Sequence, residues 1–145
     1  MKKYLFIMLV GLAVLYPKGV AKAEEPYVYL SFNQKSVGLT SNLLWDSVIP
    51  EALTLKVNSN CFHGSVVASM SSLKNRWGNE FSQSRVYIKT LATGGFVSLV
   101  KPVIISEPTF GTHEIKIDFL VKANGKIDRA GKYSGAIAFT VLPPV

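Results

Sequence analysis

The sequence predicts an all-β protein, an antiparallel immunoglobulin-like β-sandwich of about seven strands that follows a cleaved signal peptide. Two observations favour this fold. Short runs in which apolar and polar residues alternate recur throughout residues 24–145. Clusters rich in Asn, Gly and Ser separate these runs and are typical of turns. The one stretch with helical character, Asn42–Trp45, is too short to form a helical layer.

The alternating runs give the expected strands in chain order. Glu114–Val121 is the clearest, because charged residues occupy one face and apolar residues the other. The residues on the apolar face are Ile115, Ile117, Phe119 and Val121. After it, Asn124-Gly125 suits a tight turn that needs positive φ. The expected strands are Tyr27–Phe32, Leu53–Val57, Ser65–Met70, Arg85–Lys89, Phe96–Val100, Glu114–Val121 and Tyr133–Leu142.

The N-terminus has the pattern of a secretory signal. Lys2 and Lys3 precede an uncharged apolar run, Leu5–Tyr16, and Ala21-Lys22-Ala23 supplies the small residues of a cleavage site. A membrane-spanning helix needs about 20 apolar residues, more than this run contains. The sequence therefore predicts a signal peptide at residues 1–23 and a single domain at 24–145. We expect export through the general secretory pathway, no membrane span in the mature chain, and a location in the periplasm, at the cell surface or outside the cell.

Charge and cysteine content narrow the function classes. The 145 residues include 16 basic and 9 acidic side chains, for a net charge of +7. Four lysines lie in the signal segment, so the predicted mature domain carries only +3. Its lysines are dispersed, and we expect no nucleic-acid binding. The single cysteine excludes an internal disulfide framework and a Cys-rich zinc site.

No set of residues points to catalysis. Cys61 and His63 fall on one face of a strand, but a copper site needs further ligands that are not nearby in the sequence. Cys61, His113 and Asn124 follow the order of some Cys-His-Asn hydrolases, whose cysteine normally sits at a helix N-terminus, where we expect no helix. We therefore expect no enzyme, cofactor or metal. Cys61 is interpreted as a buried thiol, and pairing with a second chain is the alternative.

Two surface features have a functional interpretation beside a structural one. Arg76 and Trp77 lie in a polar loop, where an exposed tryptophan can stack on a sugar or fill a partner's pocket, or fold back onto the domain. Trp45 lies among apolar residues and is expected in the core. A basic cluster surrounds a turn that includes Asp128, and it is either a solvated loop or a site that attracts an acidic surface. The cluster comprises Lys122, Lys126, Arg129 and Lys132.

The C-terminal stretch Ala130–Val141 resembles the closing strand of bacterial fimbrial or pilus-type subunits and of spore-coat-U-like secreted proteins. In those families an Ala-Gly-x-Tyr-Ser-Gly stretch leads into alternating apolar residues. The resemblance covers about a dozen residues. Many fimbrial subunits carry a disulfide, which a chain with one cysteine cannot form internally. The candidate closing-strand residues are Gly131, Tyr133, Gly135, Ile137, Phe139 and Val141.

The resemblance implies a structural subunit of a pilus-like assembly that polymerises with other copies or related subunits by strand complementation. It also implies a periplasmic chaperone and an outer-membrane usher as partners. The candidate donor is Glu24–Phe32, and the alternative is that this segment is an ordinary first strand of its own domain. The inserted face would be Val28, Leu30 and Phe32, or Tyr27 and Tyr29. The alternative function is a soluble binding module for a glycan or a surface protein, acting through Trp77.

Overall fold

The computed structural model describes residues 24–38, 46–124, 126, 128 and 131–144, and this part of the chain is all-β. The predicted signal peptide, Asn42–Trp45, Gly125, Arg129 and Ala130 lie outside the described residues. The one helical turn in the described part is η1 (Gln83–Arg85). The strands are β1 (Val28–Phe32), β2 (Ser47–Ser59), β3 (Phe62–His63), β4 (Val66–Met70), β5 (Leu73–Lys74), β6 (Glu80–Phe81), β7 (Val86–Lys89), β8 (Val97–Ser98), β9 (Val103–Ser106), β10 (Thr109–Phe110), β11 (His113–Val121) and β12 (Ile137–Val141).

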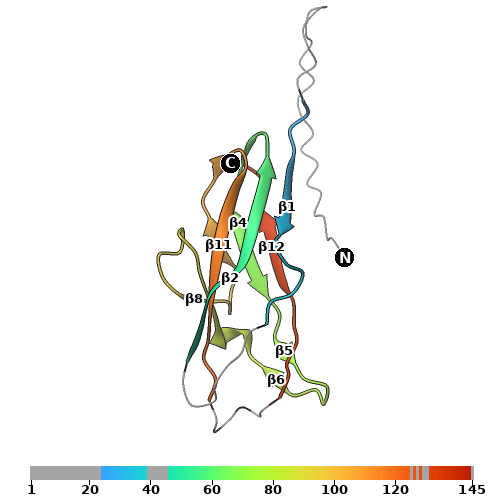
Figure 1. Cartoon of the computed structure of the whole chain (residues 1–145), viewed down its shortest axis with the longest axis vertical. Coiled ribbons are helices and arrows are strands. Elements are labelled where there is room, and N and C mark those ends of the chain that lie inside the picture. The colour runs from blue at the N-terminus through green and yellow to red at the C-terminus, as the bar shows by residue number, and fades with distance from the viewer. Residues whose placement is uncertain (1–23, 39–45, 125, 127, 129–130, 145) are drawn as a thin grey trace, which may run out of the picture.

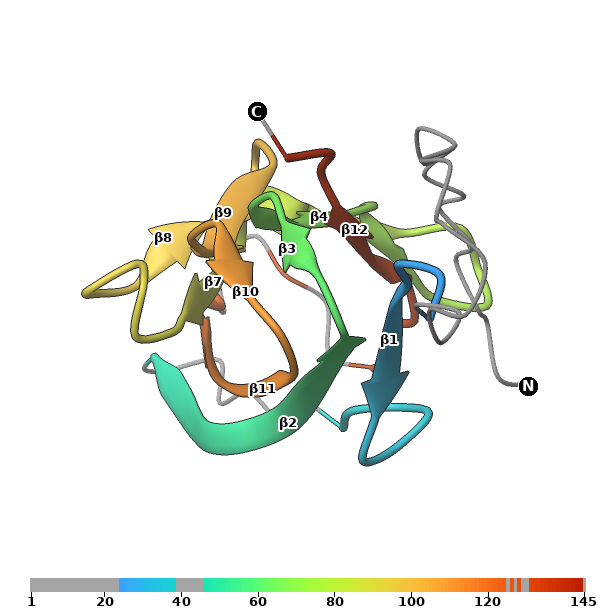
Figure 2. The ribbon, with the colours of Figure 1, turned by 90° about the horizontal axis from the view of Figure 1, so that it is seen from above.

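All strand pairs are antiparallel and form two main sheets (Figure 1). The larger sheet has the order β1-β2-β11-β7-β8, and the smaller has the order β12-β4-β9. Two short strand pairs, β10-β3 and the β5-β6 hairpin, lie at opposite ends of the long axis (Figures 1 and 2). β1 and β12 are thus edge strands of different sheets, and they run side by side in Figures 1 and 2.

The core draws on both sheets. Leu55, Val57 and Phe119 of the larger sheet and Val66 and Ala68 of the smaller one are fully buried in a single cluster. This follows from the period-2 pattern, since alternate residues of each strand point to the same side. In Figure 2 the two sheets face each other across this cluster. Residues of both sheets therefore contribute to one hydrophobic core.

The expected strands are mostly present, with different bounds. β11 matches the expectation closely, but β2 is far longer than Leu53–Val57, and β8 covers only Val97–Ser98 of the expected Phe96–Val100. β12 begins at Ile137 rather than at Tyr133. β9 was not expected from the sequence. It alternates buried and exposed residues over only four positions, which is too short a pattern to stand out.

A bulge explains the length of β2. Ile49 pairs with Phe119 and Leu53 with Ile117, so three residues of β2 lie opposite Asp118 alone. Within this bulge Glu51 has a φ of 45°. Its backbone N–H, which has left the ladder, donates to Asp118 Oδ1 at 2.7 Å. The carboxylate thus restores a hydrogen bond that the bulge removes, and pairing resumes on the far side.

Candidate assembly surface

β1 is held to the domain through one strand. Its five residues pair with β2 from Val28 opposite Ser59 to Phe32 opposite Leu55. Leu30 is the strand's one buried apolar residue, at 5% exposure, and Val28 packs partly against the core. Tyr29 and Phe32 are exposed. In the described single chain, the candidate donor segment therefore occupies a place in its own sheet.

Asn60 fixes the start of β1. Its side-chain Oδ1 accepts from the Tyr27 backbone N–H at 2.8 Å, and its Nδ2 donates to the Glu25 carbonyl at 3.1 Å. The Tyr27 and Tyr29 rings stack outside the sheet with centroids 5.8 Å apart. The two tyrosines therefore lie on the solvent side of β1, and the core-facing side belongs to Val28 and Leu30.

The other edge strand, β12, pairs only with β4 among the described strands. Phe139 faces the core in part, and its ring lies 5.6 Å from the ring of Phe32 on β1. No backbone pairing joins β1 to β12 in the described part of the chain. The two sheets thus present neighbouring strand edges that are bridged by side chains alone.

The closing-strand residues divide into two groups. Ile137, Phe139 and Val141 lie on one side of β12 and pack on the core, as their alternation predicts. Gly135 precedes the strand, and a Cβ there would lie 2.6 Å from Leu73 Cδ2, so only glycine fits against β5 without displacement. Tyr133 packs its ring on Phe81, with centroids 6.0 Å apart. Gly131 lies in an exposed bend.

Arg76 and Trp77 project from the tip of the β5–β6 hairpin. Asn75 is 9% exposed, and its Oδ1 accepts from the backbone N–H groups of Trp77 at 3.0 Å and Asn79 at 2.9 Å. Gly78 completes the turn at a φ of 81°. Trp77 is 66% exposed, and the Arg76 guanidinium lies 4.0 Å from the centre of its ring. The polar loop therefore presents its tryptophan to solvent, rather than folding it back onto the domain.

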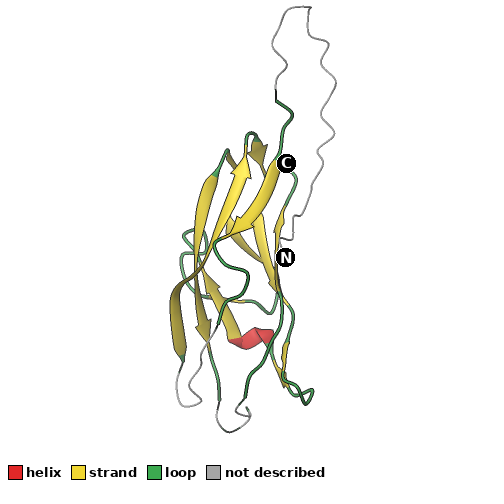
Figure 3. Ribbon diagram, turned by 45° about the vertical axis from the view of Figure 1, so that its right-hand side comes forward, coloured by secondary structure: helices red, strands yellow, loops and turns green. Residues whose placement is uncertain are grey.

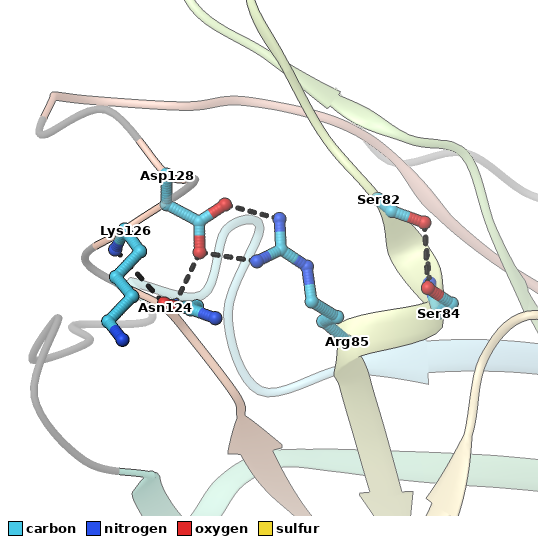
Figure 4. Close-up of polar contacts among 6 residues, drawn as sticks. All are labelled: Ser82, Ser84, Arg85, Asn124, Lys126 and Asp128. Atoms are coloured by element: carbon cyan, nitrogen blue, oxygen red, sulfur yellow. Dashed lines mark hydrogen bonds and ion pairs between the residues drawn. The ribbon is translucent and has the colours of Figure 1, made fainter.

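An ion pair between Arg85 and Asp128 holds the turn after β11, and no sequence pattern indicated it (Figure 4). Both terminal nitrogens of Arg85 donate to the Asp128 carboxylate, whose side chain is 4% exposed. Arg85 comes from η1, which Figure 3 shows in red. Burial raises the pKa of Asp128, but the hydrogen bonds and charge of Arg85 and the Asn124 N–H lower it, and the net pKa is below the usual 3.8.

The candidate catalytic residues do not converge. Asn124 lies beyond the far end of β11 from His113, on the order of 30 Å along the strand. The Cys61 thiol contacts the Tyr27 carbonyl and the Ser59 hydroxyl at 3.6 Å rather than a histidine. The structure instead stacks His63 on His113, with centroids 5.3 Å apart. That contact was missed because the two histidines are distant in the sequence.

The described residues contain neither a cluster suited to a metal ion nor a helix suited to crossing a membrane. No group of three His, Cys, Asp or Glu side chains is placed to hold a metal ion. No helix in the described ranges is long and apolar enough to cross a membrane. Comparisons with protein-family models, curated proteins and solved structures give no match.

Proposed function

We propose that the chain is a non-enzymatic structural subunit of a secreted, pilus-like assembly, with an immunoglobulin-like β-sandwich as its fold. Copies are joined when the segment Glu24–Phe32 of one pairs with β2 of the next. The observation that carries the proposal is that β1 is an edge strand held by β2 alone, so that its detachment leaves the edge of β2 unpaired. Unpaired strand edges are templates for strand addition from another chain.

Exchange of β1 fits the geometry better than addition of a separate donor. β1 already fills its place on β2, and only residues 24–27 of the predicted mature chain precede it. A neighbour's β1 can pair with β2 in the same register, with Leu30 opposite Val57, so the contacts between copies are those already made within one chain. Residues 33–46 connect β1 to β2, and a fully extended chain of that length reaches roughly 45 Å.

The energetics favour β1 as the exchanging element. Its detachment exposes one fully buried side chain, Leu30, which contributes about 2 kcal/mol, together with the backbone bonds of a five-residue pairing. β11, by contrast, is a central strand with pairings on both sides and contains the buried Ile117 and Phe119. The elements of a protein that open locally are those with the fewest buried contacts. β1 is therefore able to open while the core remains folded.

A cysteine pair across β1 and β2 distinguishes exchange from pairing within one chain. Ser31 and Lys56 are register partners with outward-facing side chains, and antiparallel partners lie within the Cα range of a disulfide. The variant is Ser31→Cys/Lys56→Cys in a Cys61→Ser background. When reduced protein assembles and is then oxidised, we expect a non-reducing gel to show a covalent ladder. When monomer is oxidised before assembly, we expect locked monomers that no longer polymerise.

The Cys61→Ser protein without the new pair is the control, and it should assemble and give no covalent ladder. Assembled material that yields only internally bridged monomers would show that β1 stays in its own chain. Undiminished assembly by the locked monomer would lead to the same conclusion.

A further inference from the structure

Charge is separated along the long axis of the domain. The end at which β1 begins is built from residues 24–27, 58–65, 106–113 and 142–144 and is named the acidic end (Figure 1). These segments contain Glu24, Glu25 and Glu107, all exposed, and no lysine or arginine. The next charged residue, Glu114, is the register partner of Lys56, and their opposite charges sum to zero. Three side-chain carboxylates thus lie in segments without lysine or arginine, and after the predicted cleavage the α-amino group of Glu24 offsets one of them.

The opposite end, named the basic end, is formed by the β5–β6 hairpin and the segment that joins β11 to β12 (Figure 1). Its two acids, Glu80 and Asp128, are paired with Lys74 and Arg85. Asp46 and Lys122 flank the last register pair of β2 and β11, Ser47 and Val121, and their opposite charges sum to zero. Three exposed cations remain among the described residues, and they are Arg76, Lys126 and Lys132.

Exposed aromatic rings accompany the charges at both ends. At the acidic end Phe62 and Phe110 are register partners on β3 and β10, and they are 48% and 70% exposed. At the basic end Trp77 is 66% exposed beneath Arg76. Tryptophan and arginine are the residues that most often dominate the binding energy of an interface. Each end therefore combines an apolar anchor with charges of the opposite sign to the other end.

We infer that the basic end of one copy docks on the acidic end of the next, with Trp77 against Phe62 and Phe110. This inference rests on the proposed function, because it names the second surface through which copies meet. A contact between two different patches is heterologous, and repeated without closure it produces a filament. The occupant is a second copy because the two ends are complementary in charge and in apolar area.

Charge reversal at each end supplies the test. One variant is Glu25→Lys/Glu107→Lys, and the other is Arg76→Glu/Lys126→Glu. In either protein alone, like charges face each other at every junction. We expect the concentration for half-maximal assembly, measured by sedimentation, to rise about tenfold or more. The matched control, Lys35→Glu/Lys101→Glu, changes net charge by the same amount as the second variant but outside the segments that form the two ends, and it should assemble like the wild type.

An equimolar mixture of the two reversed proteins gives the sharper result. In a chain in which the two variants alternate, two kinds of junction follow each other. Because β1 is exchanged, residue 25 at each acidic end comes from the neighbouring copy, while residue 107 belongs to the domain itself. At both kinds of junction the acidic end therefore has one lysine and one glutamate at these two positions, and the repulsion between like charges is relieved. We therefore expect the mixture to assemble at a lower concentration than either variant alone.

Trp77 fluorescence reports the apolar part of the contact. In a Trp45→Phe protein the remaining tryptophan is Trp77, and its emission should shift to shorter wavelength on assembly. The docking is overturned if neither reversal affects assembly, or if the mixture needs as high a concentration to assemble as its components do. Strand exchange is tested separately, by the disulfide of the Ser31→Cys/Lys56→Cys variant. Emission that responds to a glycan panel but not to assembly overturns it in favour of a binding module. A wild-type protein that does not assemble contradicts both proposals.

Discussion

Replacement of Phe119 by alanine is expected to lower the free energy of unfolding by about 4 kcal/mol, the largest single effect in the domain. Phe119 is the largest fully buried side chain among the described residues. It lies on the central strand β11, directly after the bulge, opposite Ile88 of β7 and Ile49 of β2. Its removal leaves a cavity in a core that both sheets share. Urea unfolding followed by circular dichroism measures the loss.

Val97→Ala is the matched control for Phe119→Ala. Val97 lies on the short edge strand β8 and is 39% exposed, so its truncation should change stability by no more than about 0.5 kcal/mol. A loss of less than about 1 kcal/mol for Phe119→Ala would contradict a shared core.

Arg85→Ala is expected to cost about 3 kcal/mol, because it leaves the buried Asp128 carboxylate without its partner. Arg85→Lys should recover only part of the loss, since an ammonium group cannot donate to both carboxylate oxygens from a planar fork. Lys74→Ala breaks an ion pair whose side chains are 62% and 59% exposed, and it should cost less than about 1 kcal/mol. Equal losses for the two alanine variants would contradict a special role for Asp128.

The pH dependence of unfolding tests the same ion pair independently. The folded pKa of Asp128 lies below its usual 3.8. Its contribution to stability is therefore fully present above that value and is lost as the pH falls through the folded pKa. In Arg85→Ala the lowering effect of Arg85 is gone and burial raises the pKa. We expect the stability gap between the wild type and Arg85→Ala to narrow below about pH 4. A gap that stays constant to about pH 3 would contradict this account.

The sequence predicted the regular strands because their signal is local. In β11 the alternation of Ile115 and Ile117 with charged residues is sufficient to assign both the strand and its buried face. The same local signal could not give the length of β2. Pro50 and Glu51 interrupt its alternation, and only the hydrogen bond to Asp118, distant in the sequence, shows that the strand continues through a bulge.

The candidate surface was predicted only in part, for a similar reason. The exposed Trp77 and the donor segment were named from composition and pattern, and the structure places Trp77 at a hairpin tip and β1 at a sheet edge. The burial of Asp128 depends on Arg85, 43 residues away, and no local pattern marks such a pair. The separation of charge between the ends is likewise a property of how distant segments meet.

The mass distribution of the native protein, taken from the cell surface and run unheated and heated without reductant, tests the central claim most directly. Strand-complemented copies are held together without covalent bonds. The account therefore predicts a ladder at multiples of the mature mass that collapses to monomer on heating. A single monomer-sized species before heating would contradict it, as would a ladder that survives heat and falls only with reductant, which would assign the linkage to Cys61.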